Sequence, residues 1–169
     1  MRAYLASHFF NDAMFRWTED LAVFLEEHTD LSLYVPQRNA SINDKRENDA
    51  TITDIAVAEA DTAELKKANL LIACVDGLTI DDGVAGEIMA HGVMKEMEEA
   101  AGGGIPRKII GIITDMRWQG TGRNQLYRNI MIIGKIKQHG VLIEGYAGED
   151  RYREVLLEEI RSFQEAHGA

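Results

Sequence analysis

Carboxylates gather in one short segment of this sequence, residues 76–87 (DGLTIDDGVAGE), which contains three aspartates and one glutamate. The segment follows the apolar run 70–75 and leads into a stretch of helix-forming residues. The macrodipole of a helix stabilises acidic side chains near its N-terminus, so Asp81 and Asp82 are explained by helix formation as well as by chemistry. Their residue types alone do not decide between the two interpretations.

Glu87 differs from these aspartates because it falls about one turn into the expected helix, beside Gly83, Ala85 and Gly86. Such small neighbours leave room for a ligand and keep the carboxylate accessible while it is partly removed from water. A carboxylate in that environment can attack the anomeric carbon of a sugar and hold the sugar as an ester, which divides one difficult substitution into two easier ones. An ordinary surface glutamate is the alternative that spacing alone leaves open.

The order of apolar patterns predicts an α/β fold. Apolar runs typical of buried strands alternate with segments whose apolar residues recur at helical spacing. Strands are expected at 4–6, 31–35, 70–75, 108–114 and 141–143, and helices at 13–28, 51–68, 85–101, 124–138 and 152–167. The polar stretch 37–48 is expected to be a long loop. Five strands alternating with helices imply a doubly wound five-stranded parallel sheet with helices on both faces.

Ligands of such a sheet bind beyond the carboxyl ends of the strands, where the loops converge. The segments 7–11, 76–87 and 115–129 therefore hold the residues that we expect to face a ligand. The candidate substrate-binding residues in or beside these segments are Ser7, Phe10, Asp76, Asp81, Gly83, Asn129 and Met131.

Length and composition limit the possible classes of protein. A chain of 169 residues fits one domain, which we expect to span residues 1–169. The formal net charge of −10 disfavours nucleic acid as a partner, because phosphates repel an acidic surface. The single cysteine, Cys74, lies in an apolar run and favours a reducing, cytoplasmic compartment. The apolar start of the chain is too short for a signal sequence or a membrane span, so we expect neither export nor a membrane partner.

Three separated motifs resemble those of the nucleoside 2-deoxyribosyltransferase family. Residues 4–11 (YLASHFFN) look like the family opening, a tyrosine on the first strand followed by a small-residue turn and aromatic residues. Residues 81–87 are similar to the family's Asp-x-Gly-x-x-x-Glu element, and residues 129–131 to its Asn-Leu-Met element. The motifs occur in the expected order and reach to about Gly134. This resemblance implies a flavodoxin-like sheet and an enzyme that transfers 2-deoxyribose between nucleobases.

The resemblance also implies roles for single residues. Glu87 matches the family's nucleophile and Tyr4 the phenol that orients it. Asp61, which by itself is typical of a solvated helix position, matches the acid that protonates the departing base and later deprotonates the incoming one. Asp81 matches the residue that accepts a hydrogen bond from the sugar 5′-hydroxyl, and Asn129 its partner, which family members donate from a neighbouring subunit. A homo-oligomer built from dimers, which often pair further into hexamers, is therefore expected.

The sequence departs from the family in two places. His8 stands where relatives commonly have glycine or proline, which leaves the base preference open. Some relatives end in an aromatic residue whose terminal carboxylate reaches a neighbouring site, whereas this chain ends in AHGA, and that contact is not carried over. A dinucleotide fingerprint and a P-loop are absent from the sequence and the histidines are scattered, so we expect no cofactor and no metal.

Two other functions are compatible with parts of the pattern. A related 2′-deoxynucleoside 5′-monophosphate N-glycosidase would deliver the sugar to water, but relatives of that type carry serine where this chain has Asp81. A carboxylate repels a phosphate dianion, so Asp81 favours a free 5′-hydroxyl and hence transfer. A non-catalytic nucleotide-sensing module on a similar sheet is the second alternative, and it would not need Glu87.

Overall fold

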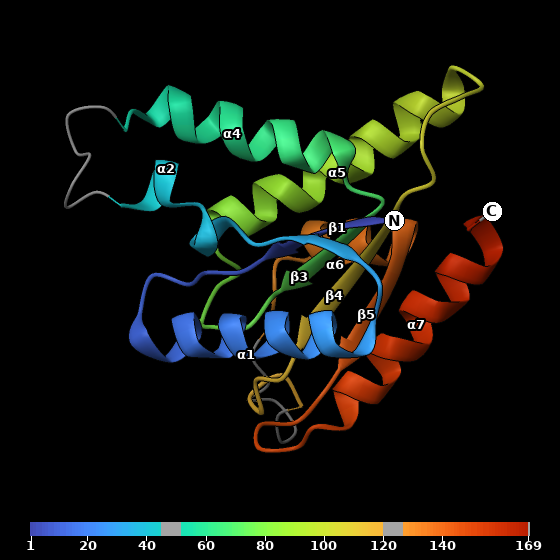
Figure 1. Ribbon diagram of the computed structural model, residues 1–169. Helices are drawn as coiled ribbons and strands as arrows, with labels where there is room; N and C mark the ends of the chain where they lie inside the picture. Colours follow the sequence, from blue (N-terminus) through green and yellow to red (C-terminus); the bar gives the residue numbers. More distant parts are fainter. Residues whose placement is uncertain (45–51, 120–126, 169) are drawn as a thin grey trace.

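A single parallel sheet forms the centre of the structure. The computed structural model describes residues 1–44, 52–119 and 127–168. The strands lie in the order β2-β1-β3-β4-β5, and every neighbouring pair is parallel (Figure 1). They are β1 (Arg2–Ala6), β2 (Ser32–Tyr34), β3 (Leu70–Cys74), β4 (Lys108–Ile113) and β5 (Gly140–Glu144). This order confirms the predicted flavodoxin-like, doubly wound α/β fold, whose strand order reverses between β1 and β3.

Helices cover both faces of the sheet, as predicted (Figure 1). One face packs against α1 (Asp12–His28) and α7 (Arg151–His167). The other packs against α4 (Asp54–Lys67), α5 (Asp82–Ala100) and α6 (Ile130–His139). Two shorter elements follow β2, namely the 3-10 turn η1 (Pro36–Arg38) and α2 (Ala40–Asn43).

Alternation along the strands separates the core into two apolar layers. On β1, Ala3 and Leu5 belong to the layer under α1 and α7, whereas Tyr4 and Ala6 belong to the layer under α4, α5 and α6. Successive side chains of a strand point to opposite faces, so a tyrosine at position 4 must face the α5 side. The fold thus places the phenol of Tyr4 on the face of the sheet where Glu87 lies.

The segment after β2 differs from the predicted long loop. Residues 36–43 form η1 and α2, while residues 45–48 of the expected loop lie outside the described part of the chain. Asn39 caps α2, because its side-chain oxygen accepts a hydrogen bond from the Ser41 N–H at 3.2 Å, and Ile42 of this turn is buried. A helix of four residues has too short an apolar pattern to be found from periodicity.

The starts of several helices also differ from the prediction, and capping side chains explain two of them. Asp81 accepts a hydrogen bond from the Val84 N–H at 3.1 Å, so α5 begins at Asp82 rather than at residue 85. Asn129 caps α6, which begins at Ile130. The start predicted for this helix, residue 124, lies outside the described residues.

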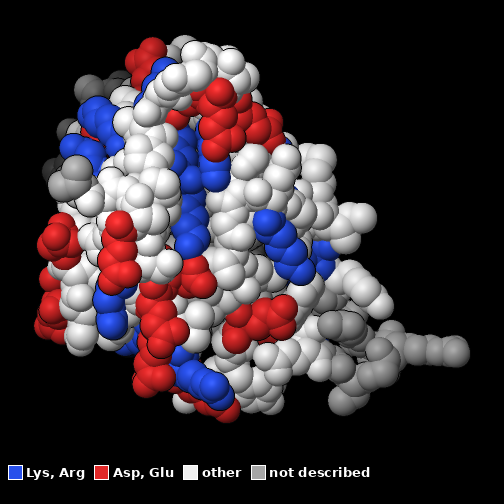
Figure 2. Space-filling view, turned by 90° about the vertical axis from the view of Figure 1, so that its right-hand side faces the viewer, with Lys and Arg blue, Asp and Glu red and all other residues white. Residues whose placement is uncertain are grey.

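Charged side chains of both signs share the surface. Figure 2 shows Lys and Arg next to Asp and Glu over one side of the molecule, without a broad area of a single sign. On this side, among the residues that the structure describes, such interspersed charges make no broad basic surface for a phosphate backbone. Among the helices of the described residues, none is long and apolar enough to cross a membrane.

Candidate active site

Tyr4 and Glu87 form the innermost polar contact of the site. Tyr4 is fully buried in β1, and Glu87 lies on the second turn of α5, above the same face of the sheet. The Tyr4 hydroxyl donates a short hydrogen bond to Oε1 of Glu87. Among the described residues, the Glu87 carboxylate accepts no other hydrogen bond, so its Oε2 is free to contact a ligand.

A second tyrosine holds a second carboxylate beside the first. Tyr34 is the register partner of Tyr4 on the neighbouring strand, and the two ring centroids are 5.2 Å apart. The Tyr34 hydroxyl donates to Oδ1 of Asp61, on α4, at 3.1 Å. Asn39 in turn donates from Nδ2 to the Tyr34 hydroxyl oxygen at 3.0 Å. Two adjacent strands therefore each present a phenol to one carboxylate on a covering helix.

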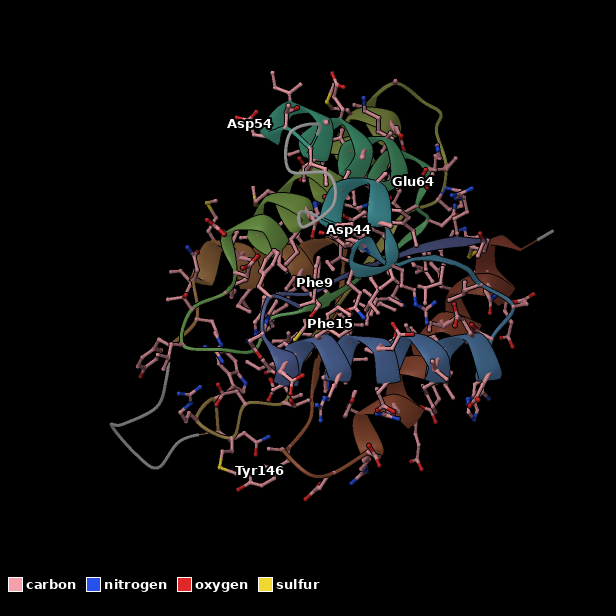
Figure 3. The ribbon with its side chains drawn as sticks, turned by 60° about the vertical axis from the view of Figure 1, so that its left-hand side comes forward. Phe9, Phe15, Asp44, Asp54, Glu64 and Tyr146 are labelled. Carbon is pink, nitrogen blue, oxygen red and sulfur yellow. The ribbon has the colours of Figure 1, made fainter. Side chains whose placement is uncertain are left out.

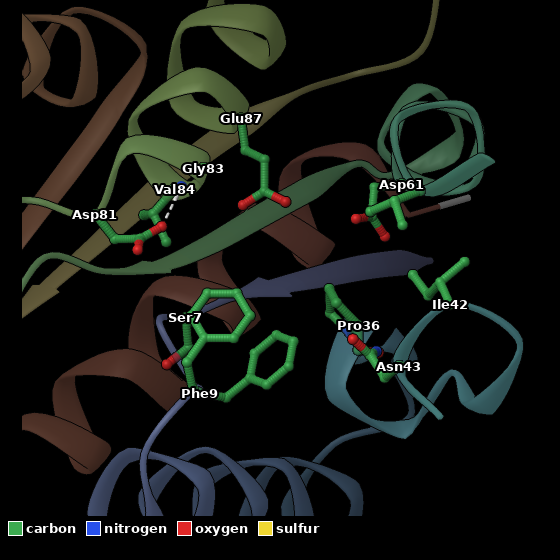
Figure 4. Close-up of a pocket in the computed structure, with 12 residues that line it drawn as sticks. Ser7, Phe9, Pro36, Ile42, Asn43, Asp61, Asp81, Gly83, Val84 and Glu87 are labelled. Atoms are coloured by element: carbon green, nitrogen blue, oxygen red, sulfur yellow. Dashed lines mark hydrogen bonds between the residues drawn. The ribbon is translucent and has the colours of Figure 1, made fainter. Parts of the chain in front are cut away.

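These carboxylates face a cavity of about 230 Å³ at the carboxyl end of β1. Figure 4 shows Asp81, Glu87 and Asp61 on the helix side of this cavity, with Phe9 and Pro36 across from them. The lining residues are Ser7, Phe9, Phe10, Pro36, Ile42, Asn43, Val57, Asp61, Asp81, Gly83, Val84 and Glu87. A mostly apolar wall with a few converging polar groups is typical of a small-molecule site.

The electrostatics of the cavity favour neutral carboxyl groups. Among the described residues, no Lys, Arg or His forms an ion pair with Glu87 or Asp61. Burial raises the pKa of Glu87 to about 7, with further raising by the negative charges of Asp61 and Asp81 and lowering by the Tyr4 hydroxyl. Burial also raises the pKa of Asp61, against the hydroxyls of Tyr34 and Tyr4. A raised pKa means that each of these carboxyl groups holds its proton more strongly than an exposed carboxyl does, which suits a group that donates or accepts a proton during a reaction.

Four further predicted residues lie at the same cavity. Asp81 lines it while capping α5, and a side chain added at Gly83 would place its Cβ only 3.2 Å from Oδ1 of Asp81. Ser7 lines it as well, and its hydroxyl oxygen accepts a hydrogen bond from Thr18 at 2.7 Å, which leaves the Ser7 hydrogen free to donate. Phe10 is 75% exposed at the cavity. The cavity thus combines acceptors, one hydroxyl donor and exposed aromatic surface.

Asp76, in contrast, lies outside the cavity lining. Its carboxylate accepts hydrogen bonds from the Thr114 N–H at 2.7 Å, the Thr114 hydroxyl at 2.6 Å and the Asp115 N–H at 2.8 Å. Asp115 is paired with Arg117 at 2.5 Å and with the buried Arg128 at 3.1 Å. Arg128 also donates to the Gly77 carbonyl oxygen. Asp76 thus ties the end of β3 to the end of β4 and lies outside the cavity lining, and its predicted contact with substrate stays a prediction.

Asn129 and Met131 also lie outside the lining of this cavity. The Asn129 side-chain oxygen accepts hydrogen bonds from the Met131 N–H at 3.0 Å and the Ile132 N–H at 3.4 Å. Met131 is 60% exposed. The predicted contact of these two residues with substrate therefore stays a prediction.

Several residues of the site were missed from the sequence. Tyr34 and Asn39 support Asp61, and Phe9, Asn43 and Val57 line the cavity. Tyr34 was part of a predicted strand, but its place on the same face as Tyr4 depends on the pairing of these two strands, which the structure shows. His8 does not line the cavity, and its buried Nδ1 has no hydrogen-bond partner among the described residues.

The fold and the site define a class of α/β protein that binds a small ligand at the switch point of a parallel sheet and presents paired carboxylates to it. A family model described as "Nucleoside 2-deoxyribosyltransferase" matches residues 3–131. The chain therefore belongs to the nucleoside 2-deoxyribosyltransferase family, which confirms the resemblance found in its motifs. The matched region contains Tyr4, Asp61, Asp81 and Glu87.

Solved structures with the same fold span nearly the whole chain. A conserved protein from Enterococcus faecalis V583 is 29% identical, with a TM-score of 0.77, over 96% of this chain and 98% of that one. A 2-deoxyribosyltransferase from the psychrotolerant bacterium Bacillus psychrosaccharolyticus is 17% identical, with a TM-score of 0.56, over 96% of each chain. A 2-desoxiribosyltransferase from Leishmania mexicana is 12% identical, with a TM-score of 0.51, over 93% of this chain and 97% of that one. No curated protein matches the sequence.

Proposed function

We propose that this protein transfers 2-deoxyribose from a 2′-deoxynucleoside to a free nucleobase through an ester of the sugar with Glu87. The observation that carries the proposal is the Glu87 carboxylate, which is held by Tyr4, lacks a cationic partner among the described residues and faces a ligand-sized cavity beside a second carboxyl group. Membership of the family supports the same activity.

In the first half of the proposed reaction, Oε2 of Glu87 attacks C1′ of the deoxyribose. The bond from C1′ to the base nitrogen breaks, its electron pair stays on the base, and Asp61 donates a proton to the base. Tyr4 keeps Oε1 occupied, so the other oxygen is directed at the sugar. Protonation is needed because a nucleobase anion leaves poorly.

In the second half, an incoming base attacks C1′ from the side that the first base left. The C1′–Oε2 bond breaks and returns the electron pair to Glu87, while Asp61 accepts the proton that the new base loses. Two inversions retain the configuration at C1′. No cofactor takes part in this sequence.

The polar groups at the sugar end of the cavity favour a free 5′-hydroxyl. The Asp81 carboxylate can accept a hydrogen bond from that hydroxyl, whereas it would repel a phosphate dianion. This feature supports transfer over the alternative, hydrolysis of 2′-deoxynucleoside 5′-monophosphates. We also infer that deoxyribosides react faster than ribosides, because a 2′-hydroxyl would crowd the nucleophile.

The proposal includes a homo-oligomer built from dimers. Ile130 and Met131 are 83% and 60% exposed at the start of α6, next to Asn129. An apolar, exposed helix start is suited to contact a second copy, and such a contact would bring Asn129 and Met131 to the neighbouring cavity. Light scattering of the purified protein measures the assembly directly.

One incubation tests the activity. The protein is mixed with deoxyinosine and adenine, and chromatography follows new deoxyadenosine and free deoxyribose, while mass spectrometry of quenched samples follows added sugar mass on the peptide that contains Glu87. Deoxyadenosine and a deoxyribosylated peptide support the proposal. Free sugar as the main product would favour the hydrolase, and no turnover with any deoxynucleoside or deoxynucleotide would favour a binding module.

A further inference from the structure

Tyr34 occupies a place in the site that mirrors the place of Tyr4. Both residues lie at the same register position of adjacent parallel strands, and both side chains face the layer under α4 and α5. Tyr4 donates to Glu87 and Tyr34 donates to Asp61. Tyr4 therefore serves Glu87 and also acts on Asp61, whereas the hydrogen bond of Tyr34 goes to Asp61.

The direction of the hydrogen bonds around Tyr34 is determined by its neighbours. The Ser41 N–H can only donate, and it lies 3.2 Å from the Asn39 side chain, so the atom it meets is the Asn39 oxygen. The Asn39 amide nitrogen must then face Tyr34, where it donates to the phenol oxygen at 3.0 Å. The phenol hydrogen is left to point at Oδ1 of Asp61, 3.1 Å away. A chain of donors therefore runs from Ser41 through Asn39 and Tyr34 to Asp61.

We propose that Tyr34 is a positioning residue for the acid: its hydroxyl fixes Oδ1 of Asp61, leaves Oδ2 as the atom that carries the transferred proton, and stabilises the carboxylate that remains once the base has been protonated. This inference rests on the proposed function. The inference goes beyond the proposed function because it assigns the transferred proton to Oδ2 of Asp61. It also assigns the orientation of that carboxyl group to Tyr34, on the edge strand β2.

The balance of charge explains why such a donor is useful. When Oε2 of Glu87 bonds to C1′, the glutamate becomes a neutral ester and the only new anion in the pair is Asp61. No cation among the described residues is placed to stabilise that anion, so neutral hydroxyl donors must do so. Burial raises the pKa of Tyr34 to about 12, against the Asn39 hydrogen bond, and the phenol therefore keeps its hydrogen throughout the cycle.

Two variants interrupt the chain at different points. Tyr34→Phe removes the donor itself. Asn39→Asp keeps the shape and the acceptor for Ser41, but its carboxylate would accept the phenol hydrogen and draw it away from Asp61. Tyr146→Phe is the matched control, because Tyr146 lies on the side of the molecule away from α4 and its residues Asp54 and Glu64 (Figure 3). If Tyr34→Phe unfolds, as judged by its thermal midpoint, Asn39→Asp carries the test alone.

The assay compares two donors that differ in their need for protonation, thymidine and 5-fluoro-2′-deoxyuridine, and measures kcat/KM for the donor. For both variants we expect a loss of about ten-fold with thymidine and of less than about three-fold with the fluorinated donor, whose base leaves as a better anion. Carboxyl carbon-13 NMR, with Asp61→Asn for assignment, should show the Asp61 titration moved to higher pH by roughly half a unit to one unit. The Tyr146→Phe protein should match the wild type.

Equal losses with both donors and an unmoved Asp61 titration would show that Tyr34 only supports the structure, and would overturn the inference while the wild-type exchange activity stands. Absence of exchange and of sugar-labelled Glu87 in the wild type would instead remove the proposed function. The two failures are therefore distinguishable in one set of measurements.

Discussion

Two pairs of carboxylates lie near the carboxyl ends of the inner strands, and their surroundings are opposite. Asp115 is held by two arginines, and Asp76 accepts three hydrogen bonds from the end of β4. Glu87 and Asp61 have phenols as partners and, among the described residues, no cation. Acidic residues are equally visible in the sequence at both places, so residue type does not separate a structural carboxylate from a reactive one. The partner does.

Asp115 also differs from Glu87 and Asp61 in proton affinity. The Arg117 hydrogen bond, assisted by Arg128, holds the pKa of Asp115 below its usual range. Burial raises the pKa values of Glu87 and Asp61. An arginine-bound carboxylate is a poor nucleophile and a poor acid at neutral pH, whereas a desolvated one with a raised pKa suits both tasks.

Glu87→Gln is expected to have the largest effect of any change that tests this comparison. The amide cannot form the ester, so exchange should fall by more than about a thousand-fold. Asp115→Asn is the matched change in the other pair, and we expect it to retain turnover within about ten-fold of the wild type at a temperature where it is folded. Initial rates of deoxyadenosine formation measure both. Similar losses from the two changes would remove the functional distinction between the pairs.

Arg128→Met should have the next largest effect, on stability. Its guanidinium is buried and binds Asp115 and the Gly77 carbonyl, so its loss removes one of the two arginines that hold Asp115 and the donor that Arg128 gives to the Gly77 carbonyl oxygen. We expect the free energy of unfolding to fall by about 2 to 4 kcal/mol in urea denaturation. Arg16→Met, which removes an exposed pair with Asp12, should change it by less than about 0.5 kcal/mol. A loss at Arg128 no larger than the loss at Arg16 would contradict the structural role of this pair.

Tyr4→Phe should lower exchange by about ten- to a hundred-fold, because Glu87 loses the donor that orients it and stabilises its ionised form. The covalent ester should still form, which mass spectrometry of quenched samples can detect. A rate equal to that of the wild type would mean that the short contact between the phenol and Oε1 has no catalytic consequence.

The smallest effect concerns stability against pH. Between the ordinary pKa of Glu87, 4.5, and its raised value of about 7, the folded protein holds a proton that the unfolded chain has released, so stability falls as pH rises through this window. The contribution of Asp115 to stability depends on pH in the opposite direction. Because its pKa is depressed, it contributes stability that is lost as pH falls below 3.8. As pH rises from 4.5 to 7, the free energy of unfolding of Glu87→Gln should therefore increase relative to that of the wild type by on the order of 2 kcal/mol. A constant difference across these pH values would show that Glu87 keeps its ordinary pKa.

The sheet could be predicted from the sequence because its inner strands are continuous apolar runs. All five residues of β3 are buried, and such a run has few other interpretations. The turn at α2 could not be predicted, because it depends on one capping side chain, Asn39, and on the burial of Ile42 by distant parts of the fold. Tertiary contacts of this kind leave no periodic signal.

The candidate site was predictable where one motif carried both position and chemistry. Glu87 follows a buried strand and small residues, and the structure brings it to the cavity beside Asp61, with the buried Tyr4 as its hydrogen-bond donor. Asp76 comes from the same acidic segment, but the groups that donate to its carboxylate belong to Thr114 and Asp115, directly after β4 and 38 and 39 positions along the chain. Tyr34 was missed because its role depends on which strand pairs with β1. Pairing partners cannot be read from a single strand.

The shortness of β2 has a consequence for the tolerance of this protein to insertions. The strand has three residues and is paired on one side only. Its register with β1 nevertheless determines that Tyr34, and not Leu33, faces Asp61. Displacement by a single position would turn the phenol to the opposite side of the sheet and bring a leucine into its place. The length of the connection between α1 and β2 is therefore constrained by the register of β2 with β1 and not by loop flexibility. Lengthening this connection by one residue should be more harmful than lengthening it by two.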